Sequence, residues 1–334
     1  MSIRYLVRSS ALVALGVLGA SQAQANLGLT AQGVALGFTL SQFALTNPGN
    51  NGCCDGPFGV AVDVASNHVL VNVGNGTRYV FNNVDGQTLG SAIGSVASDT
   101  YVGAYATAAG KAYGGSFNNG NFYQFNGDGT VNHQLTGVTA SASLGMWGNP
   151  TNGHLIATSN QGLIDIDPLA NAGTGSFRVI NGASGDGVSV SADGKTVYLA
   201  AGNLLAYNIL TGALTATFNP GAGFGLDGTG VIISTDPGLD GRIIAAMNSG
   251  DVNLINPLDG SFVNIATGGT RLDYASADVT NGTLFIDAAD AVWRLSCGVN
   301  CSIGGPPPIP EPSTYALLLA GLGFIGVVVR RRRA

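Results

Sequence analysis

A repeat of about 43 residues is the feature that most constrains how this chain of 334 residues can fold. Short apolar segments recur along the sequence, and each ends in an aromatic or aliphatic residue just before a turn. The final apolar residues of the six segments lie 44, 41, 41, 48 and 40 residues apart, at Phe81, Phe125, Ile166, Tyr207, Ile255 and Leu295. A period of this length is typical of one four-stranded propeller blade.

Two earlier segments of the same kind precede each of these residues. Small residues dominate the first, or inner, segment, as strands around a crowded central channel require. The inner segments lie at 60–62, 102–105, 144–147, 188–190, 231–233 and 274–277. The sixth repeat has no outermost segment of its own before Cys297. We therefore expect the N-terminal run 34–40 to supply that strand and close the ring, which would remove an exposed sheet edge.

The sequence thus predicts an all-β fold, a six-bladed β-propeller over residues 26–304 closed by the N-terminal strand. A seventh blade would need about 40 residues more than the chain has. The 52 glycines fit a fold made of strands and turns, and so does the near absence of glutamate, with Glu311 the only one. The arrangement resembles propellers of the NHL and quinoprotein-like kinds in general, and no signature selects one family.

The N-terminus has the order of a secretory signal peptide over residues 1–25. Arg4 and Arg8 precede an apolar run at 11–20, and the small residues Ala23 and Ala25 offer a cleavage site before Asn26. A first core helix is the alternative, which the glycines of the run and the Ala-x-Ala ending disfavour.

The C-terminus has three elements of unlike chemistry. A proline-rich spacer at 305–314 contains Pro310, Glu311, Pro312 and Ser313. An apolar run at 315–329 follows, and the stop-transfer cluster closes the chain with Arg330, Arg331, Arg332 and Arg333. Such a cluster favours a cytoplasmic C-terminus for a transmembrane helix in segment 315–334. Fifteen residues span only about 22 Å of a ~30 Å apolar layer, so the anchor is a short one.

This order resembles the PEP-CTERM sorting signal of Gram-negative bacteria. The resemblance covers the last 25 to 30 residues and implies that an exosortase-type transpeptidase recognises Pro310–Glu311–Pro312 and removes the helix. It also implies an exported protein, transiently anchored in the inner membrane and then placed at the cell surface or in the extracellular matrix. An ordinary tail anchor with a chance Pro-Glu-Pro is the alternative.

Four cysteines in an exported chain are disulfide candidates. Cys53 and Cys54 lie near the start of the predicted mature region, and Cys297 and Cys301 lie at its end. Because a bond between neighbouring residues is strained, we expect at least one bridge from the first pair to the second. A local bond between Cys297 and Cys301 and a metal site are the alternatives.

Charge and motifs exclude several functions. The net charge is −6 and the isoelectric point is near 4.8, so the chain lacks the basic face that nucleic-acid binding needs. No nucleophile elbow, zincin motif or phosphate-binding loop occurs. His68 and His154 occupy matching positions in their repeats, and we interpret both as blade-surface residues.

Aspartates recur where the chain enters the inner segments. Asp55, Asp99, Asp186, Asp227 and Asp273 share this position, and these connections gather at one mouth of a propeller channel. Carboxylate oxygens there suit Ca²⁺ or hydroxyl-rich glycans, with Asp186, Asp227 and Asp273 as the metal candidates. Aspartates that merely cap tight turns are the simpler interpretation.

Two functions follow as hypotheses. The favoured one is a non-enzymatic exported binding or matrix protein, without a cofactor, that presents its polar face to an exopolysaccharide or envelope partner. The alternative is a Ca²⁺-dependent propeller hydrolase of the lactonase kind that uses the channel-mouth aspartates. The absence of glutamate from the propeller counts against the alternative.

Overall fold

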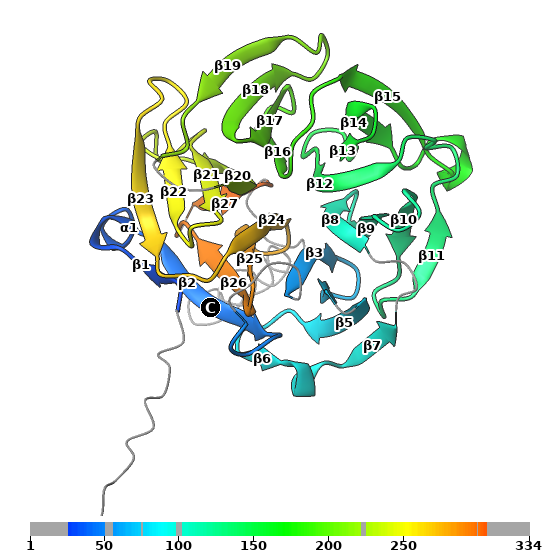
Figure 1. Ribbon diagram of the computed structural model, residues 1–334, viewed down its shortest axis with the longest axis horizontal. Coiled ribbons are helices and arrows are strands. Elements are labelled where there is room, and N and C mark those ends of the chain that lie inside the picture. The colour runs from blue at the N-terminus through cyan, green and yellow to red at the C-terminus, as the bar shows by residue number, and fades with distance from the viewer. Residues whose placement is uncertain are drawn as a thin grey trace, which may run out of the picture.

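Six sheets, antiparallel except for one short parallel pair, stand around a central channel and form a propeller (Figure 1). The computed structural model describes residues 26–50, 56–74, 76–97, 102–221, 225–298 and 300–305. The predicted six-bladed β-propeller is therefore confirmed. The signal-peptide and C-terminal helix predictions fall outside these residues, and within them no helix is long and apolar enough to cross a membrane.

Blades 1 to 3 each have four strands, which run in chain order from the channel outward. Blade 1 contains β3 (Pro57–Asp63), β4 (His68–Val73), β5 (Thr77–Asn82) and β7 (Gly94–Ala97). Blade 2 contains β8 (Val102–Ala108), β9 (Lys111–Ser116), β10 (Phe122–Phe125) and β11 (Val131–Gln134). Blade 3 contains β12 (Ala142–Gly148), β13 (Leu155–Ser159), β14 (Gly162–Asp167) and β15 (Ser176–Asn181).

Blades 4 to 6 follow the same plan, with additions from the chain ends. Blade 4 contains β16 (Val188–Val190), β17 (Thr196–Ala201), β18 (Asn203–Asn208) and β19 (Leu214–Phe218). Blade 5 contains β20 (Leu226–Ser234), β21 (Ile243–Met247), β22 (Val252–Ile255) and β23 (Phe262–Thr267), flanked by β27 (Cys301–Ile303) and β1 (Gly28–Leu29). Blade 6 contains β24 (Leu272–Asp278), β25 (Thr283–Ala288), β26 (Ala291–Ser296), β2 (Thr39–Leu45) and β6 (Gln87–Thr88). The short 3₁₀ turns η1 (Leu89–Ser91) and η2 (Asn171–Gly173) lie in connections.

The N-terminal strand completes the last blade, as the sequence predicts. β2 pairs antiparallel with β26, from Thr39 opposite Ser296 to Leu45 opposite Ala291 (Figure 1). The predicted segment was wrong by about five residues, because the run 34–40 begins in a helix. That helix, α1 (Ala31–Ala35), packs against β23 of blade 5.

Local capping explains why residues 31–35 are helical. The Thr30 side chain accepts a hydrogen bond from the backbone N–H of Gly33, which caps the N-terminus. At the other end, Gly37 has φ +82°, and the N–H groups of Gly37 and Phe38 donate to the carbonyls of Val34 and Gly33. This is the Schellman arrangement, which ends a helix and turns the chain sharply. The strand can begin only after it.

The C-terminal strand lies on the channel side of blade 5 (Figure 1). β27 pairs with β20, the innermost strand of that blade, with Ile303 opposite Ile232. A disulfide joins Cys297, after β26, to Cys301 at the start of β27. The expected bridge from these cysteines to Cys53 or Cys54 is therefore wrong. The short loop between the two strands brings Cys297 and Cys301 together locally, whereas Cys53 and Cys54 lie outside the described residues.

A buried arginine stabilises the junction between β2 and the rest of blade 6. Arg294 of β26 is 9% exposed, and its guanidinium carbon lies 4.9 Å from the ring centroids of both Phe43 and Phe285. The same guanidinium pairs with Asp85 at 2.6 Å and with the fully buried Asp278 at 3.3 Å. Arg294 thus makes both cation–π contacts and two ion pairs at the closing seam, by which we mean the paired strands β2 and β26.

We predict that Arg294→Met lowers the free energy of unfolding by about 3 kcal/mol, because it leaves the buried Asp278 carboxylate without its counter-ion. Urea denaturation of the full-length protein in detergent measures this change. Lys195→Met is the matched control, since the Lys195–Asp193 pair is exposed, and it should change stability by less than about 1 kcal/mol. Equal effects of the two substitutions would contradict a role for Arg294 in the seam.

Candidate functional site

One position near the start of each inner strand lines one mouth of the channel. Asp186, Asp227 and Asp273 hold it in blades 4, 5 and 6, while Phe58 and Leu144 hold it in blades 1 and 3. These five side chains, together with Arg271, line a cavity of about 190 Å³. Carboxylates therefore occupy one side of this aspartate mouth and apolar side chains the other.

In five of the six blades, an irregularity in strand pairing lies at the level of the mouth. In five blades the register between the inner strand and the next one shifts at this level: at 57–60, 102–104, 142–146, 226–228 and 272–274. A β-bulge inserts an extra residue on one strand and redirects its side chain. The bulge therefore recurs in these five blades, although the residue at the bulge differs from blade to blade.

A glycine that directly follows the mouth position lets adjacent blades approach. A Cβ atom on Gly187 would lie 1.8 Å from the carbonyl oxygen of Asp227, and one on Gly145 would lie 2.4 Å from that of Asp186. Any side chain at either position would push neighbouring inner strands apart. The glycines thus bring the backbones that carry Asp186 and Asp227 into direct contact.

The carboxylates of the mouth share one arginine. Arg271 pairs with Asp273 through its Nε and lies 3.7 Å from Asp227 through Nη2. Burial raises the pKa of Asp227 to about 6, and the negative charge of Asp186 adds to this shift. Burial likewise raises the pKa of Asp186, against a hydrogen bond with Asp227. Burial thus favours the protonated form of both carboxyl groups.

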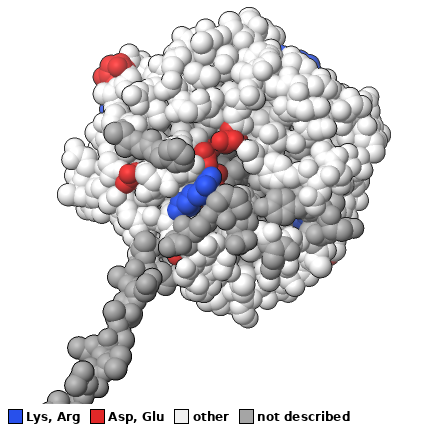
Figure 2. Space-filling view, in the orientation of Figure 1, with Lys and Arg blue, Asp and Glu red and all other residues white. Residues whose placement is uncertain are grey.

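Figure 2 looks onto this mouth, where acidic and basic atoms lie side by side near the centre of the ring. The grouping of Asp186, Asp227 and Asp273 that the sequence predicts is thus present in the structure. Asp55 and Asp99, which shared the pattern, lie outside the described residues. Asn248, in the turn between β21 and β22, also acts on this site, because its side-chain hydrogen bond lowers the pKa of Asp227.

Sequence reasoning missed Arg271, Phe58 and Leu144. The aspartates were found as a set of like residues, so apolar residues at the same position in other blades escaped notice. A glycine follows that position in blades 1 to 5, at residues 59, 103, 145, 187 and 228. This recurring glycine is the signal that would have identified Phe58 and Leu144, although it identifies neither Asp273, which precedes Tyr274, nor Arg271.

Among the described residues, no three His, Cys, Asp or Glu side chains are arranged to hold a metal ion. The three aspartates are oxygen donors of the kind Ca²⁺ prefers, but Ca²⁺ takes six to eight such ligands. Arg271 supplies a positive charge to two of the three carboxylates. A calcium ion would have to displace this guanidinium, so the donor set fits the metal poorly.

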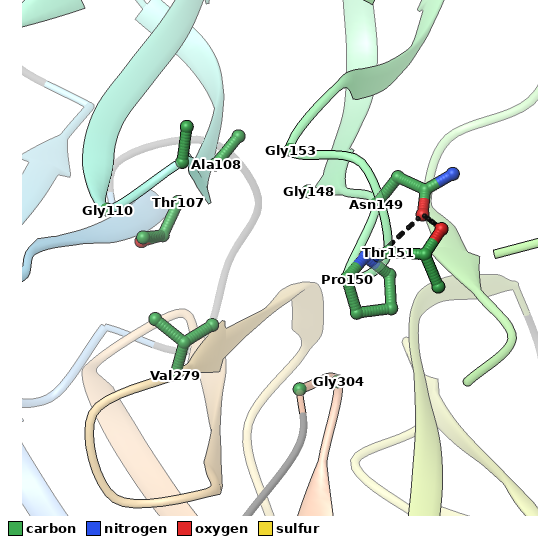
Figure 3. Close-up of a pocket in the computed structure, with 12 residues that line it drawn as sticks. Thr107, Ala108, Gly110, Gly148, Asn149, Pro150, Thr151, Gly153, Val279 and Gly304 are labelled. Carbon is green, nitrogen blue, oxygen red and sulfur yellow. Dashed lines mark hydrogen bonds between the residues drawn. The ribbon is translucent and has the colours of Figure 1, made fainter. Parts of the chain in front are cut away.

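The opposite, far mouth holds a larger cavity of about 290 Å³ with no titratable side chain (Figure 3). Its walls come from the β8–β9 and β12–β13 turns, with Val279 and Gly304 on the remaining side. The Asn149 side chain accepts hydrogen bonds from the backbone and hydroxyl of Thr151 and thereby fixes one wall (Figure 3). The smaller aspartate mouth, which carries the charged groups, is therefore the better candidate site.

Behind the aspartate mouth lies a fully buried carboxyl group. Asp287 of β25 is 1% exposed, and its Oδ2 accepts a hydrogen bond of 2.7 Å from the backbone N–H of Gly59 in blade 1. The pKa of Asp287 is raised to about 8: burial is the main cause, the charge of the nearby Asp273 adds to the shift, and the Gly59 hydrogen bond opposes both. The folded protein therefore holds a proton that the unfolded chain, with an ordinary aspartate, releases near pH 4.

Asp287 therefore contributes to the free energy of unfolding, and this contribution is fully present below pH ~4. It is lost as the pH rises through about 8. We predict that Asp287→Asn flattens the fall in unfolding free energy between about pH 5 and pH 8, by up to about 1.4 kcal/mol per pH unit. Urea denaturation across this range measures the slope. The exposed Asp259→Asn control should keep the wild-type slope, and an unchanged slope in Asp287→Asn would contradict the assignment.

Comparison with known proteins adds a motif and a fold. Residues 308–333 match the PEP-CTERM protein-sorting motif. No curated protein matches the chain in sequence. The PEP-CTERM resemblance of the C-terminus is thereby confirmed, and such a motif implies an exported protein that is transiently anchored in a membrane and processed by an exosortase.

Two solved structures illustrate the fold. The chain is similar to a gluconolactonase from Xanthomonas campestris, with a TM-score of 0.56, 17% identity, and coverage of 80% of this chain and 93% of the other. It is also similar to the WD40 β-propeller domain of Doa1, with a TM-score of 0.51, 14% identity, and coverage of 72% and 78%. At such identities the likeness shows the propeller fold alone. The chain is an exported six-bladed β-propeller protein that carries a PEP-CTERM sorting motif.

Proposed function

We propose that the protein is a non-enzymatic binding module that holds a hydroxyl-rich glycan of an exopolysaccharide or of the cell envelope at its aspartate mouth. The observation that carries the proposal is the division of this mouth into a carboxylate side and an apolar side within one cavity. The carboxylates of Asp186, Asp227 and Asp273 accept hydrogen bonds from hydroxyl groups. Phe58 and Leu144 offer an apolar surface to the C–H face of a sugar ring.

The cavity size and the charge narrow the ligand. About 190 Å³ is smaller than the roughly 300–1,000 Å³ typical of drug-sized ligands, which suits one sugar unit of a longer chain. Three carboxylates against one guanidinium disfavour an acidic sugar. We therefore expect a neutral or amino-bearing sugar. The sorting motif supports this function, because an exported protein is placed where such glycans occur.

A Ca²⁺-dependent hydrolase of the lactonase kind remains the alternative proposal. The aspartates of the mouth, on which both proposals rely, are the feature that favours the hydrolase. Its difficulty is Arg271, which pairs with two of the carboxylates that the ion would need. Calcium binding and lactone hydrolysis therefore serve as the outcomes that decide between the two functions.

We predict that the full-length protein in detergent binds neutral or amino-bearing oligosaccharides from a defined panel, and that Asp186→Asn and Phe58→Ala each weaken binding by about tenfold or more, a loss of at least about 1.4 kcal/mol. Titration calorimetry measures the dissociation constants. Asp193→Asn is the matched control because Asp193 lies in an exposed blade-4 turn between β16 and β17. The amide oxygen that Asp193→Asn introduces can still accept the hydrogen bond from the Lys195 backbone N–H.

Equal losses in all three variants would contradict a glycan site at the aspartate mouth, as would the absence of binding to every panel member. Melting curves with EDTA and then with millimolar Ca²⁺ test the alternative. A ligand that binds only the folded state at about 100 times its dissociation constant adds about 2.7 kcal/mol of stability. A Ca²⁺-dependent rise that Asp186→Asn abolishes, together with hydrolysis of gluconolactone, would establish the hydrolase instead.

A further inference from the structure

Blade 3 carries a second cluster of titratable side chains, away from the channel. His154 lies just before β13, Asp165 and Asp167 lie on β14, and Arg178 lies on β15. These residues line an open cavity of about 230 Å³ together with Ser176 and Phe177. Asp165 and Asp167 are two residues apart on one strand, so their side chains share a face of the sheet.

Two neighbours fix the orientation of the His154 ring. Its Nδ1 lies 2.8 Å from Oδ1 of Asp165, and the Nη2 of Arg178 donates to the other oxygen of that carboxylate at 2.7 Å. Asp165 is 7% exposed, so the carboxylate that holds the ring is itself buried. A carboxylate only accepts hydrogen bonds, and the Nδ1 atom therefore carries the hydrogen. In the neutral imidazole, the lone pair then lies on Nε2.

A second possible metal ligand, an oxygen of Asp167, lies near that lone pair. The Nε2 of His154 lies 3.9 Å from Oδ2 of Asp167, and the Asp167 side chain is 40% exposed. The other oxygen of Asp167 accepts hydrogen bonds from the backbone N–H groups of Leu169 and Ala170, which hold the carboxylate in place. An imidazole nitrogen and a carboxylate oxygen thus face one open cavity from fixed positions.

We propose that His154 and Asp167 bind a divalent transition-metal ion such as Zn²⁺, Ni²⁺ or Cu²⁺, with water completing the coordination. An imidazole whose other nitrogen donates to a carboxylate is the arrangement that orients metal-ligating histidines, and Asp165 supplies that carboxylate. A nitrogen and oxygen donor pair suits these ions, whereas Ca²⁺ and Mg²⁺ require oxygen ligands. Two protein ligands leave coordination positions open to a group from another molecule.

His68 offers an internal comparison. It holds the position equivalent to His154 in blade 1, but its Nδ1 contacts the backbone carbonyl of Gly127 at 2.9 Å. The two histidines therefore have the same place in the blade and different partners. The chain contains three histidines, so each imidazole signal can be assigned by single substitution.

The test follows the imidazole NMR signals of isotopically labelled histidines while Ni²⁺ is titrated into the full-length protein in detergent, without an affinity tag. We expect substoichiometric Ni²⁺ to broaden the imidazole signal of His154 before those of His68 and His133. His154→Gln and Asp167→Asn should each weaken Zn²⁺ binding, measured by calorimetry, by about tenfold or more. The amide oxygen that Asp167→Asn introduces can still accept the two backbone hydrogen bonds, so folding should be kept. His68→Gln should bind Zn²⁺ like the wild type.

Broadening of His68 or His133 at the same Ni²⁺ concentration as His154 would overturn the proposal, because it would show general surface binding. Wild-type Zn²⁺ affinity in Asp167→Asn would overturn it as well. Circular dichroism of each variant separates loss of the site from loss of the fold. Glycan binding at the aspartate mouth should be unchanged in His154→Gln, so the two proposals stand or fall separately.

Discussion

The pairing of β2 with β26 is the constraint on which the rest of the ring depends. A propeller has no covalent link between its last blade and its first, so closure must come from a strand that belongs to one end of the chain and packs in the blade of the other. Here six residue pairs join the two strands, and Arg294 connects them to Asp278 and to Asp85 of the blade-1 region. Without this seam, the inner strands would have no fixed circumference.

A fixed circumference is what gives the aspartate mouth its geometry. In five blades a bulge lies at the level of the mouth, and glycines set the distance between neighbouring blades. The backbone thus repeats while the side chain varies, so the chemistry of the mouth depends on which residue each blade supplies. Three aspartates follow one another in blades 4 to 6, and this order makes the mouth two-sided rather than uniformly acidic.

Much of this fold could be predicted from the sequence, because the blade period is carried by many residues at once. The closing strand was misplaced because residues 34–40 alternate like a strand, while Thr30 and Gly37 impose helix ends that a search for alternation does not weigh. The disulfide was mispaired because spacing along the chain does not show that β27 returns to the channel directly after β26.

The candidate site could be predicted in part for a related reason. Like residues at a fixed spacing are visible in one sequence, which is how Asp186, Asp227 and Asp273 were found. Arg271 has no equivalent arginine in the other blades, so the repeat pattern could not identify it. The hydrogen bond between His154 and Asp165 crosses from one strand to the next, so it depends on a register that only the structure supplies.

The path of the chain out of the propeller decides which face a processing enzyme meets. Gly304 and Gly305 line the far mouth, opposite the aspartates, and only residues 306–309 separate Gly305 from Pro310. At no more than about 3.6 Å per residue, the cleavage motif begins within roughly 18 Å of that mouth. A processing enzyme that binds this motif therefore acts within that distance of the far mouth. The aspartate mouth opens at the other end of the channel, away from Gly305.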